Sequence, residues 1–476
     1  MVKTLFAIML SAFTVASSLQ SYCQSSVCGR VSSHGKGIRN VVVTDGFSTT
    51  LTDKKGDYSL SVHPLSKFVY ISTPSGYSAP LNGENLPQFF QKIEGRNANR
   101  VNFLLDRDSR GDSVHRIVFW ADPQVRKPSD MEQLRDAVSD LKDVVDENLK
   151  YAYFGIGCGD IVFDNLTLFG EYNAIAAKAG IPFYHALGNH DMDYNKRSDE
   201  GSSASFEKAY GPTYYSFNKG SIHYVVLDNV FYIGRDHLYI GYLTAQQQDW
   251  LKKDLSYLQK GSTVIIVLHI PSALDANDLA KFDSKNINAS LSNKEALYSL
   301  LEPFNAHIVS GHTHTMRNVS ISGNIYEHNV SSVCGSWWNG PVAQDGSPKG
   351  YLVLEANGDN LKWYYKSIGF PLSHQMRFYP IGANLEQPEY ITVNVWGWDW
   401  EWKVYWYEDD VRMGEMERYS GLDPFTLEAY RQLGDKKPKW FGPLETDHLF
   451  KAKPRSSTAK VKVEVVDRFG NSYWAE

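Results

Sequence analysis

Between about His115 and Ser367 the sequence alternates short apolar runs with stretches of helical periodicity, and this alternation constrains the fold more than any other feature. The run HRIVFW precedes DMEQLRDAVSDLKDVVDENL, in which Met131, Leu134 and Val138 begin a series of apolar residues at helical spacing. Further strand-like runs follow, among them YAYFGIG, PFYHALG, STVIIVLH and AHIVSG. Alternating strands and helices predict a layered α/β domain whose functional residues gather at strand ends.

The segments on either side have a different pattern of residues. From about Gln24 to Asp108, short β-prone runs are separated by turn residues, which predicts a small β-sandwich. The stretch GRVSSHGKGIRNVVVTDGFSTTLTDKKGDYSLSV also resembles a transthyretin-like accessory module. After about Gly369 strand character returns, and we expect a mostly-β domain. The predicted division is a signal peptide at 1–23, an N-terminal transthyretin- or Ig-like β-sandwich at 24–110, the α/β domain at 111–368 and a C-terminal β-domain at 369–476.

The first residues, MVKTLFAIMLSAFTVASSLQSYCQ, have the layout of a secretory signal peptide. One Lys is followed by an apolar run from Leu5 to Val15, which is too short to span a bilayer as a stable helix. Cleavage after Cys23 would give an extracytoplasmic protein, periplasmic or secreted, without a transmembrane segment. A lipid anchor on Cys23 is the alternative, although the bulky Tyr22 directly before it fits poorly.

Composition excludes several classes of protein. With 42% hydrophobic and 21% charged residues the chain lies in the ordinary globular range. The net charge of −6, without a long basic run, argues against a nucleic-acid-binding surface. Cys28, Cys158 and Cys334 lack metal-ligand spacing, and we interpret them as packed thiols or as one disulfide and a spare. The sequence carries no signal for the oligomeric state.

Acidic, amide and imidazole side chains recur where the apolar runs of the α/β segment end. A single histidine after a strand is usually structural, but five strand ends that all deliver oxygen or nitrogen donors describe a pocket for two divalent metals. The donors are Asp122 after IVFWA, Asp160 after FGIGCG, Asn189, His190 and Asp191 after YHALG, His269 after VIIVL, and His312 and His314 after AHIVSG.

The motifs DPQ, GD, GNHD, LHIP and GHTH resemble, in the same order, the signature of the calcineurin-like metallophosphoesterases. That signature runs Asp-x-His, Gly-Asp, Gly-Asn-His followed by Asp or Glu, a lone His, and Gly-His-x-His. The resemblance implies a central two-sheet β-sandwich flanked by helices. It also implies a metal-dependent hydrolase of phosphoester bonds, either a phosphodiesterase or a phosphatase, whose substrate partner is a phosphoester.

Carried over residue by residue, the resemblance assigns ligands to two metals. Asp160 would bridge the metals, and a hydroxide held between them would attack the phosphate in line. The remaining ligands would be Asp122, Gln124 and His314 at the first site, and Asn189, His269 and His312 at the second.

Two further residues of the GNHD motif would act in catalysis. His190 would be free of the metals and would assist the leaving group as a general acid. Asp191 would hydrogen-bond the other ring nitrogen of His190 and keep the imidazole oriented. A histidine at this position helps poor leaving groups, which favours diesters over monoesters.

Gln124 departs from the family pattern, because it offers a neutral amide oxygen where the family usually has an imidazole. Our hypothesis is that Gln124 still coordinates and that the first site prefers Mn²⁺ or Mg²⁺ to Zn²⁺, with Fe a further candidate in the centre. The alternative is that Gln124 points away. The central domain would then be catalytically degenerate, and the chain would be a binding or scaffolding protein.

Weaker signals suggest residues around the pocket. Asp164 and Asn165 in GDIVFDN would orient a ligand or cap a helix. Tyr194 would line the mouth, and Trp337, Trp338 and Asn339 in CGSWWNG would form a substrate wall or simply pack.

A run of alternating tryptophans stands in the predicted C-terminal domain. Trp396, Trp398, Trp400 and Trp402 alternate as on one face of a strand. Packing in a core or at a domain interface is the ordinary interpretation, and a platform for sugar or lipid is the alternative.

Overall fold

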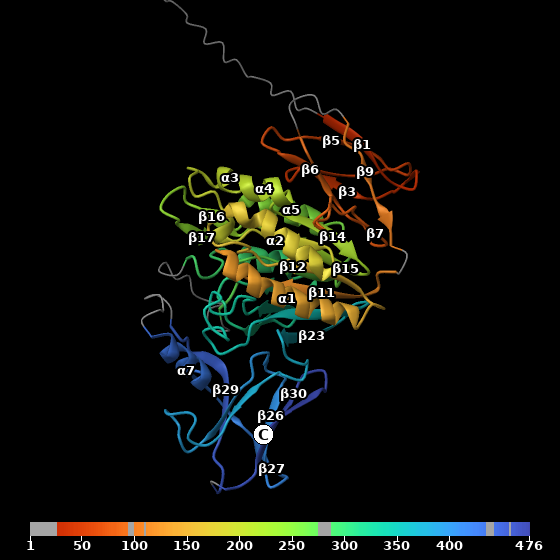
Figure 1. The fold of residues 1–476 in the computed structure, drawn as a ribbon. Coiled ribbons are helices and arrows are strands. Elements are labelled where there is room, and N and C mark those ends of the chain that lie inside the picture. The colour runs from red at the N-terminus through yellow and green to blue at the C-terminus, as the bar shows by residue number, and fades with distance from the viewer. Residues whose placement is uncertain (1–25, 94–99, 109–110, 275–286, 435–441, 457) are drawn as a thin grey trace, which may run out of the picture.

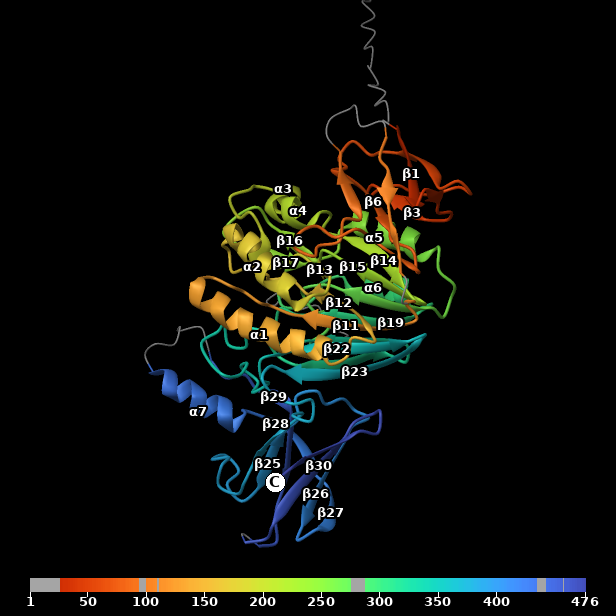
Figure 2. The same cartoon turned by 45° about the vertical axis from the view of Figure 1, so that its right-hand side comes forward.

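The computed structural model describes residues 26–93, 100–108, 111–274, 287–434, 442–456 and 458–476. N-terminal strands lie at one end, helices and long strands lie in the middle, and C-terminal strands lie at the other end (Figures 1 and 2). The predicted signal peptide at 1–23 lies outside the described residues. Within the described ranges no helix combines the length and the apolar composition needed to cross a membrane.

Two sheets form the middle region, and one hydrophobic core contains buried side chains of both, including Ile117, Phe119 and Ile266. The first sheet has the order β13-β12-β11-β22-β23, with β11 (Val114–Trp120), β12 (Ala152–Gly157), β13 (Phe183–His185), β22 (Gly350–Asn357) and β23 (Asn360–Ser367). The second has the order β14-β15-β18-β19-β21-β20, with β14 (Tyr215–Lys219), β15 (Ile222–Val226), β18 (Thr263–Val267), β19 (Asn305–Ser310), β20 (Arg317–Ser322) and β21 (Ile325–Asn329). A separate hairpin pairs β16 (Val230–Tyr232) with β17 (Tyr239–Gly241).

Helices flank this sandwich. Helix α1 (Pro128–Asp146) forms over the predicted stretch and buries Met131, Leu134 and Val138 in one cluster with Trp120 of β11. The other helices are α2 (Phe169–Ala176), α3 (Asp199–Ser202), α4 (Ala204–Tyr210), α5 (Ala245–Leu255) and α6 (Lys294–Leu301). The predicted fold class, a helix-flanked two-sheet sandwich with β-rich regions on both sides, is confirmed.

The N-terminal region is built from short strands in two four-stranded sheets. Strand β5 alternates buried and exposed side chains, as expected for a sheet with one face in a core. The strands are β1 (Ser26–Ser33), β2 (Lys36–Gly37), β3 (Val42–Thr44), β4 (Thr49–Leu51), β5 (Asp57–Ser61), β6 (Phe68–Ser72), β8 (Phe90–Lys92) and β9 (Phe103–Leu104), with a small added pair of β7 (Tyr77–Ser78) and β10 (Asp106–Arg107).

The C-terminal region also has two four-stranded sheets, and its core contains Val393, Val404 and Val463. One sheet holds β24 (Arg377–Tyr379), β25 (Ile391–Asn394), β28 (Glu417–Gly421) and β29 (Thr446–Ala452). The other holds β26 (Lys403–Glu408), β27 (Val411–Glu415), β30 (Val461–Val466) and β31 (Ser472–Ala475). Helix α7 (Pro424–Leu433) begins at Asp423, whose side chain accepts a hydrogen bond from the backbone N–H of Thr426.

The expectation that the four tryptophans share one strand face is wrong. Residues 395–402 connect β25 to β26 and contain no strand. Trp396 and Trp402 are buried, whereas Trp400 is 43% exposed and Trp398 is half-buried. The physical reason is that the connection turns twice, so alternate residues do not point to the same side.

Candidate metal centre

The predicted donors follow the carboxyl ends of strands in both sheets of the sandwich. β11, β12 and β13 run parallel, as do β18 and β19, so within each sheet these ends lie at one edge. Five of the donor residues have a positive φ: Asp122 (48°), Gln124 (41°), Asp160 (54°), His312 (70°) and His314 (58°). Such left-handed conformations are costly for non-glycine residues and cluster at functional sites.

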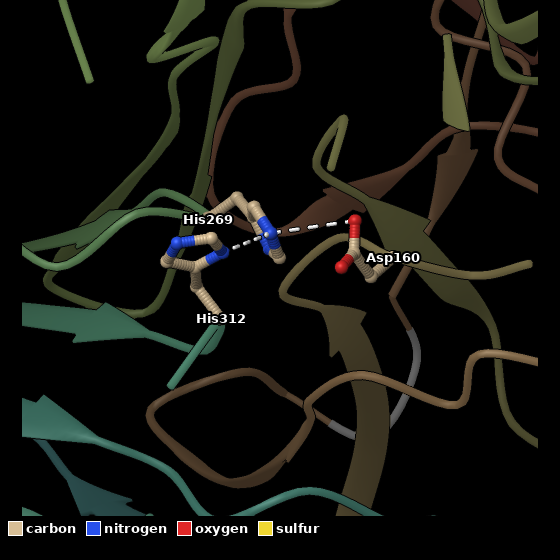
Figure 3. A group of neighbouring side chains, drawn as sticks. All are labelled: Asp160, His269 and His312. Carbon is tan, nitrogen blue, oxygen red and sulfur yellow. Dashed lines mark hydrogen bonds and ion pairs between the residues drawn. The ribbon is translucent and has the colours of Figure 1, made fainter. Parts of the chain in front are cut away.

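At the second predicted site, the atoms that could bind a metal lie around one nitrogen, Nε2 of His269. His269 Nε2 lies 3.0 Å from Asn189 Oδ1, 3.2 Å from His312 Nδ1 and 3.3 Å from Asp160 Oδ1. Asp160, His269 and His312 form a group whose donor atoms all lie within 4.8 Å of one another (Figure 3). All four residues predicted for this site therefore meet in one place.

The outer ring nitrogens of the histidines fix which nitrogen faces the centre. His269 Nδ1 lies 2.8 Å from the carbonyl of Cys158, and His312 Nε2 lies 2.9 Å from the carbonyl of Asn288. His314 Nδ1 lies 3.1 Å from the carbonyl of Gly335. A carbonyl accepts only an N–H, so each neutral imidazole keeps a lone pair on its inner nitrogen, as a metal ligand requires.

The first predicted site is less complete. Gln124 Nε2 donates to Asp160 Oδ2 over 2.6 Å, and His314 Nε2 lies 3.7 Å from Asp122 Oδ1. Gln124 Oε1 and His314 Nε2 are both buried without a hydrogen-bond partner among the described residues. Buried polar atoms of this kind are costly unless something satisfies them, and a cation would accept both lone pairs. The donor set therefore fits a divalent metal.

Electrostatics also favour a cation at this place. Burial and the nearby Asp160 raise the pKa of Asp122 to about 8. Burial opposes a charge on His269, but Asp160 outweighs it and raises the pKa of His269 to about 9. Burial lowers the pKa of His312 to about 3 and of His314 to about 4, which keeps these imidazoles neutral. The raised pKa values mean that Asp122 and His269 hold protons in this cluster, and bound metal ions would displace those protons.

His190 stands beside these donors, and Asp164 rather than Asp191 orients it. His190 Nε2 lies 4.0 Å from Asp160 Oδ2, and its Nδ1 lies 2.8 Å from Asp164 Oδ1. Phe163 stacks on the imidazole at a ring-centre distance of 4.0 Å. Burial lowers the pKa of His190, but the Asp160 and Asp164 carboxylates outweigh that effect and raise it.

The predicted contact between Asp191 and His190 is wrong. The turn at Asn189–Asp191 directs the carboxylate of Asp191 back to the backbone N–H groups of Ile161, Val162 and Gly188, at 3.0 to 3.1 Å. Asp191 therefore ties the GNHD turn to the loop that follows Asp160.

The predicted substrate-binding residues lie in different surroundings. Tyr194 donates to the carbonyl of Asn189, and the Trp337 ring stacks on His314 at 4.3 Å. Trp338 donates from Nε1 to the carbonyl of Pro123 over 2.8 Å, so it holds the loop between Asp122 and Gln124. Asn339 donates to carbonyls of its own turn, and Asn165 accepts from Thr167 Oγ1 over 2.6 Å.

Sequence reasoning missed three buried residues that hold the ligand loops. Asn229 accepts from the N–H groups of His269 and Ile270, at 3.2 and 3.1 Å. Glu327 of β21 accepts from the N–H groups of Ser272 and Ala273 and from Ser310 Oγ, at 2.8, 3.1 and 2.8 Å. Asn329 donates to the carbonyl of Gly311 over 2.6 Å. Their signal was a polar residue within or just after an apolar run, as in VVLDN and NIYEHN.

Family profiles match most of the chain. The profile described as calcineurin-like phosphoesterase matches residues 115–316, which include every motif from Asp122 to His314. Profiles described as the N-terminal and the C-terminal of calcineurin-like phosphoesterase match residues 25–108 and 327–473.

Individual relatives are distant. Purple acid phosphatase 15 of Arabidopsis thaliana is 27% identical over 188 residues, which are 38% of this chain and only 32% of that protein's length. A dimetal phosphatase from Danio rerio has 14% identity and a TM-score of 0.38, covering 54% of this chain and 99% of that one. A purple acid phosphatase from yellow lupin (Lupinus luteus) has 13% identity and a TM-score of 0.38, covering 69% and 67% of the two chains.

Proposed function

Because the chain belongs to the calcineurin-like phosphoesterase family, we propose that it hydrolyses phosphoester bonds with two divalent cations, and diesters in preference to monoesters. The observation that supports this best is the convergence of Asn189, His312 and Asp160 on His269 Nε2, at 3.0 to 3.3 Å. These nitrogen and oxygen atoms are ligand types that divalent metals bind, and a cation among them would replace the proton that His269 shares with Asp160.

The residues that would hold the cations divide into two sets around Asp160. Bound there, the cations would polarise the phosphate and lower the pKa of the attacking water. Asp160 would be shared; Asp122, Gln124 and His314 would serve one cation, and Asn189, His269 and His312 the other. Gln124 favours Mn²⁺ as the native ion, because an amide oxygen is a hard donor.

His190 would donate a proton to the leaving alcohol. Asp164 accepts the Nδ1 hydrogen and Phe163 stacks on the ring, so both hold the imidazole with Nε2 toward Asp160. The raised pKa of His190 favours the protonated imidazole that a general acid needs. Alkoxide leaving groups of diesters depend strongly on such a proton.

Replacing His190 tests this role. In a series of phosphodiesters that runs from p-nitrophenyl esters to alkyl esters, His190→Ala should lower kcat by about 10²- to 10⁴-fold for the alkyl esters. The loss should grow as the pKa of the leaving alcohol rises, and His34→Asn at an exposed turn is the matched control. Equal losses across a series of leaving groups would contradict a general-acid role for His190.

A second candidate function rests on Gln124 alone. If this amide does not coordinate, the central domain is a degenerate phosphoesterase that serves as a binding or scaffolding protein. Metal analysis after purification separates the two proposals, since a degenerate domain should retain little transition metal.

We also propose an extracytoplasmic location, on the strength of the layout of residues 1–23. We further propose that the chain divides into domains near residues 110 and 368. Sequencing the N-terminus of the exported protein should give Gln24, and retention of Met1 would contradict secretion.

A further inference from the structure

Two of the four tryptophans in the 395–402 connection line a groove that the proposed reaction does not use. The groove has a volume of about 300 Å³ and lies between β20, the last strand of the six-stranded sheet, and the C-terminal region. Trp398 and Trp400 contribute indole rings, and Arg317, Asn318 and Arg418 contribute polar groups. We name this site the tryptophan groove.

The indole rings are held in place by buried polar contacts. Asn318 donates from Nδ2 to the carbonyls of Gly397 and Trp398, at 3.0 and 3.1 Å, which fixes the connection against β20. Asp399 is fully buried and accepts two hydrogen bonds from Arg468, whose guanidinium lies 5.1 Å from the centre of the Trp400 ring. A rigid aromatic surface binds without a large entropic cost of ordering.

Guanidinium groups lie over one face of each of these rings. The guanidinium of Arg418 lies 3.7 Å from the centre of the Trp398 ring and forms an ion pair with Asp447. Arg317 donates from Nη1 to the carbonyl of Leu274 over 2.8 Å, which anchors its guanidinium at the groove. Trp400, which is 43% exposed, is therefore the more open indole of the groove, and guanidinium and carboxylate groups lie beside it.

We propose that the tryptophan groove binds a saccharide. The indole of Trp400 matches the apolar C–H face of a pyranose ring, while the guanidinium and carboxylate groups pair with neighbouring hydroxyls. A lipid chain would remove these charged groups from water and offer them no hydrogen bond in exchange, which is costly. A polynucleotide would need a longer basic surface than this chain of net charge −6 offers.

The tryptophan groove lies close to the metal centre along the chain. Arg317 follows His314 by three residues, so their Cα atoms are separated by no more than about 11 Å. Leu274 follows His269 by five residues. The saccharide is therefore either the alcohol part of the phosphoester substrate, which rests on the proposed function, or a separate oligosaccharide that brings the enzyme to its substrate.

Binding is tested without reference to catalysis. The full chain is titrated with maltotriose, cellotriose and chitotriose to millimolar concentration, and intrinsic tryptophan fluorescence is recorded. At least one trisaccharide should bind, and Trp400→Ala should weaken that binding by about tenfold. Arg317→Gln, which keeps both indoles, should weaken it as well. Trp474→Ala, which removes a 54% exposed tryptophan on β31, is the matched control and should have no effect.

A kinetic arm distinguishes the two sources of the saccharide. If the substrate supplies it, Trp400→Ala raises KM for glucose 1-phosphate and leaves KM for phenyl phosphate unchanged. If a separate oligosaccharide supplies it, Trp400→Ala weakens trisaccharide binding and leaves both KM values unchanged. Failure of the wild-type chain to hydrolyse both of these esters and also bis(p-nitrophenyl) phosphate would contradict the proposed function, while the fluorescence titration still tests the groove.

Two results would overturn the saccharide site. One is that none of the trisaccharides and no glycosyl phosphate binds to the wild-type chain. The other is that Trp400→Ala and Trp474→Ala bind saccharide equally well. Saturable binding of AMP in place of every saccharide, lost in Trp400→Ala, would also contradict the proposal and would assign the groove to nucleotides.

Discussion

Around His269 three donor atoms lie 3.0 to 3.3 Å from one nitrogen, whereas around His314 the nearest carboxylate oxygen of Asp122 is 3.7 Å away. The protein alone therefore assembles the second half of the metal centre more completely than the first. In the first half, Gln124 Oε1 and His314 Nε2 are buried without hydrogen bonds among the described residues. A preassembled half and a half that a cation must complete should differ in metal affinity.

The two halves also differ in how they are supported. The loop after β18 that carries His269 is held by Asn229 and Glu327, two buried side chains on other strands or their ends. In the first half, Trp338 holds the loop through the carbonyl of Pro123 over 2.8 Å, and Trp337 stacks on His314. Several short hydrogen bonds to a buried carboxylate give a stiffer frame than aromatic packing does.

Removing the shared carboxylate should have the largest effect. Asp160→Asn should lower kcat/KM for bis(p-nitrophenyl) phosphate by about a thousandfold or more, because both halves lose their common charge. Metal content should fall for both cations, as measured by elemental analysis. Asp143→Asn on the exposed face of α1 is the control. Retention of one tightly bound cation by Asp160→Asn would contradict a shared ligand.

Removing one histidine from each half in turn should show the difference in metal affinity between the halves. His314→Ala should keep one tightly bound Mn²⁺ in the preassembled half, whereas His312→Ala should lose the tight ion and keep only the weaker one. The expected difference in affinity between the variants is about 10- to 100-fold, measured by calorimetric titration. Equal affinities of the two variants would remove the distinction between the halves.

Replacing the buried carboxylate of Glu327 should have an effect almost as large on metal binding. In Glu327→Gln one acceptor oxygen becomes an NH₂ that faces the N–H group of either Ser272 or Ala273, because these two groups donate to different oxygens of Glu327. The free energy of unfolding should fall by about 1 to 3 kcal/mol, and the preassembled half should lose metal affinity. Chemical denaturation measures the first effect, with Glu295→Gln at an exposed site of α6 as the control. Lost affinity at unchanged stability would point to a direct role for Glu327 instead.

The smallest effect should come from restoring imidazole in the first half. Gln124→His should shift preference from Mn²⁺ toward Zn²⁺ by about tenfold, because imidazole is a softer donor than an amide oxygen. Competitive metal loading followed by elemental analysis measures the ratio. Unchanged preference and occupancy would mean that Gln124 is not a ligand.

Much of this architecture could be predicted from sequence, because strand ends are marked by apolar runs that stop at a donor. The order of motifs from Asp122 to His314 indicated the fold and which residues would meet. Proximity in the chain was misleading for Asp191, which is adjacent to His190 but accepts hydrogen bonds from backbone N–H groups such as that of Val162. The carboxylate that contacts His190 belongs to Asp164, in another loop. Pairings between loops depend on tertiary geometry, and periodicity does not encode them.

The tryptophans illustrate the same limit at the other end of the chain. Alternation of Trp396 to Trp402 predicted one strand face, but Asp399 turns the chain by accepting hydrogen bonds from Arg468 and from the N–H of Glu401. Residues more than sixty positions apart therefore decide which indoles are exposed. Local patterns identified the residues, and long-range contacts determined their roles.

The number of Mn²⁺ ions bound by the metal-stripped protein tests the central claim most directly. Calorimetric titration together with electron paramagnetic resonance should show two ions per chain, one bound more tightly than the other, with a spin-coupled signal at saturation. A single uncoupled ion, or none, would contradict a two-metal centre and would favour the degenerate domain.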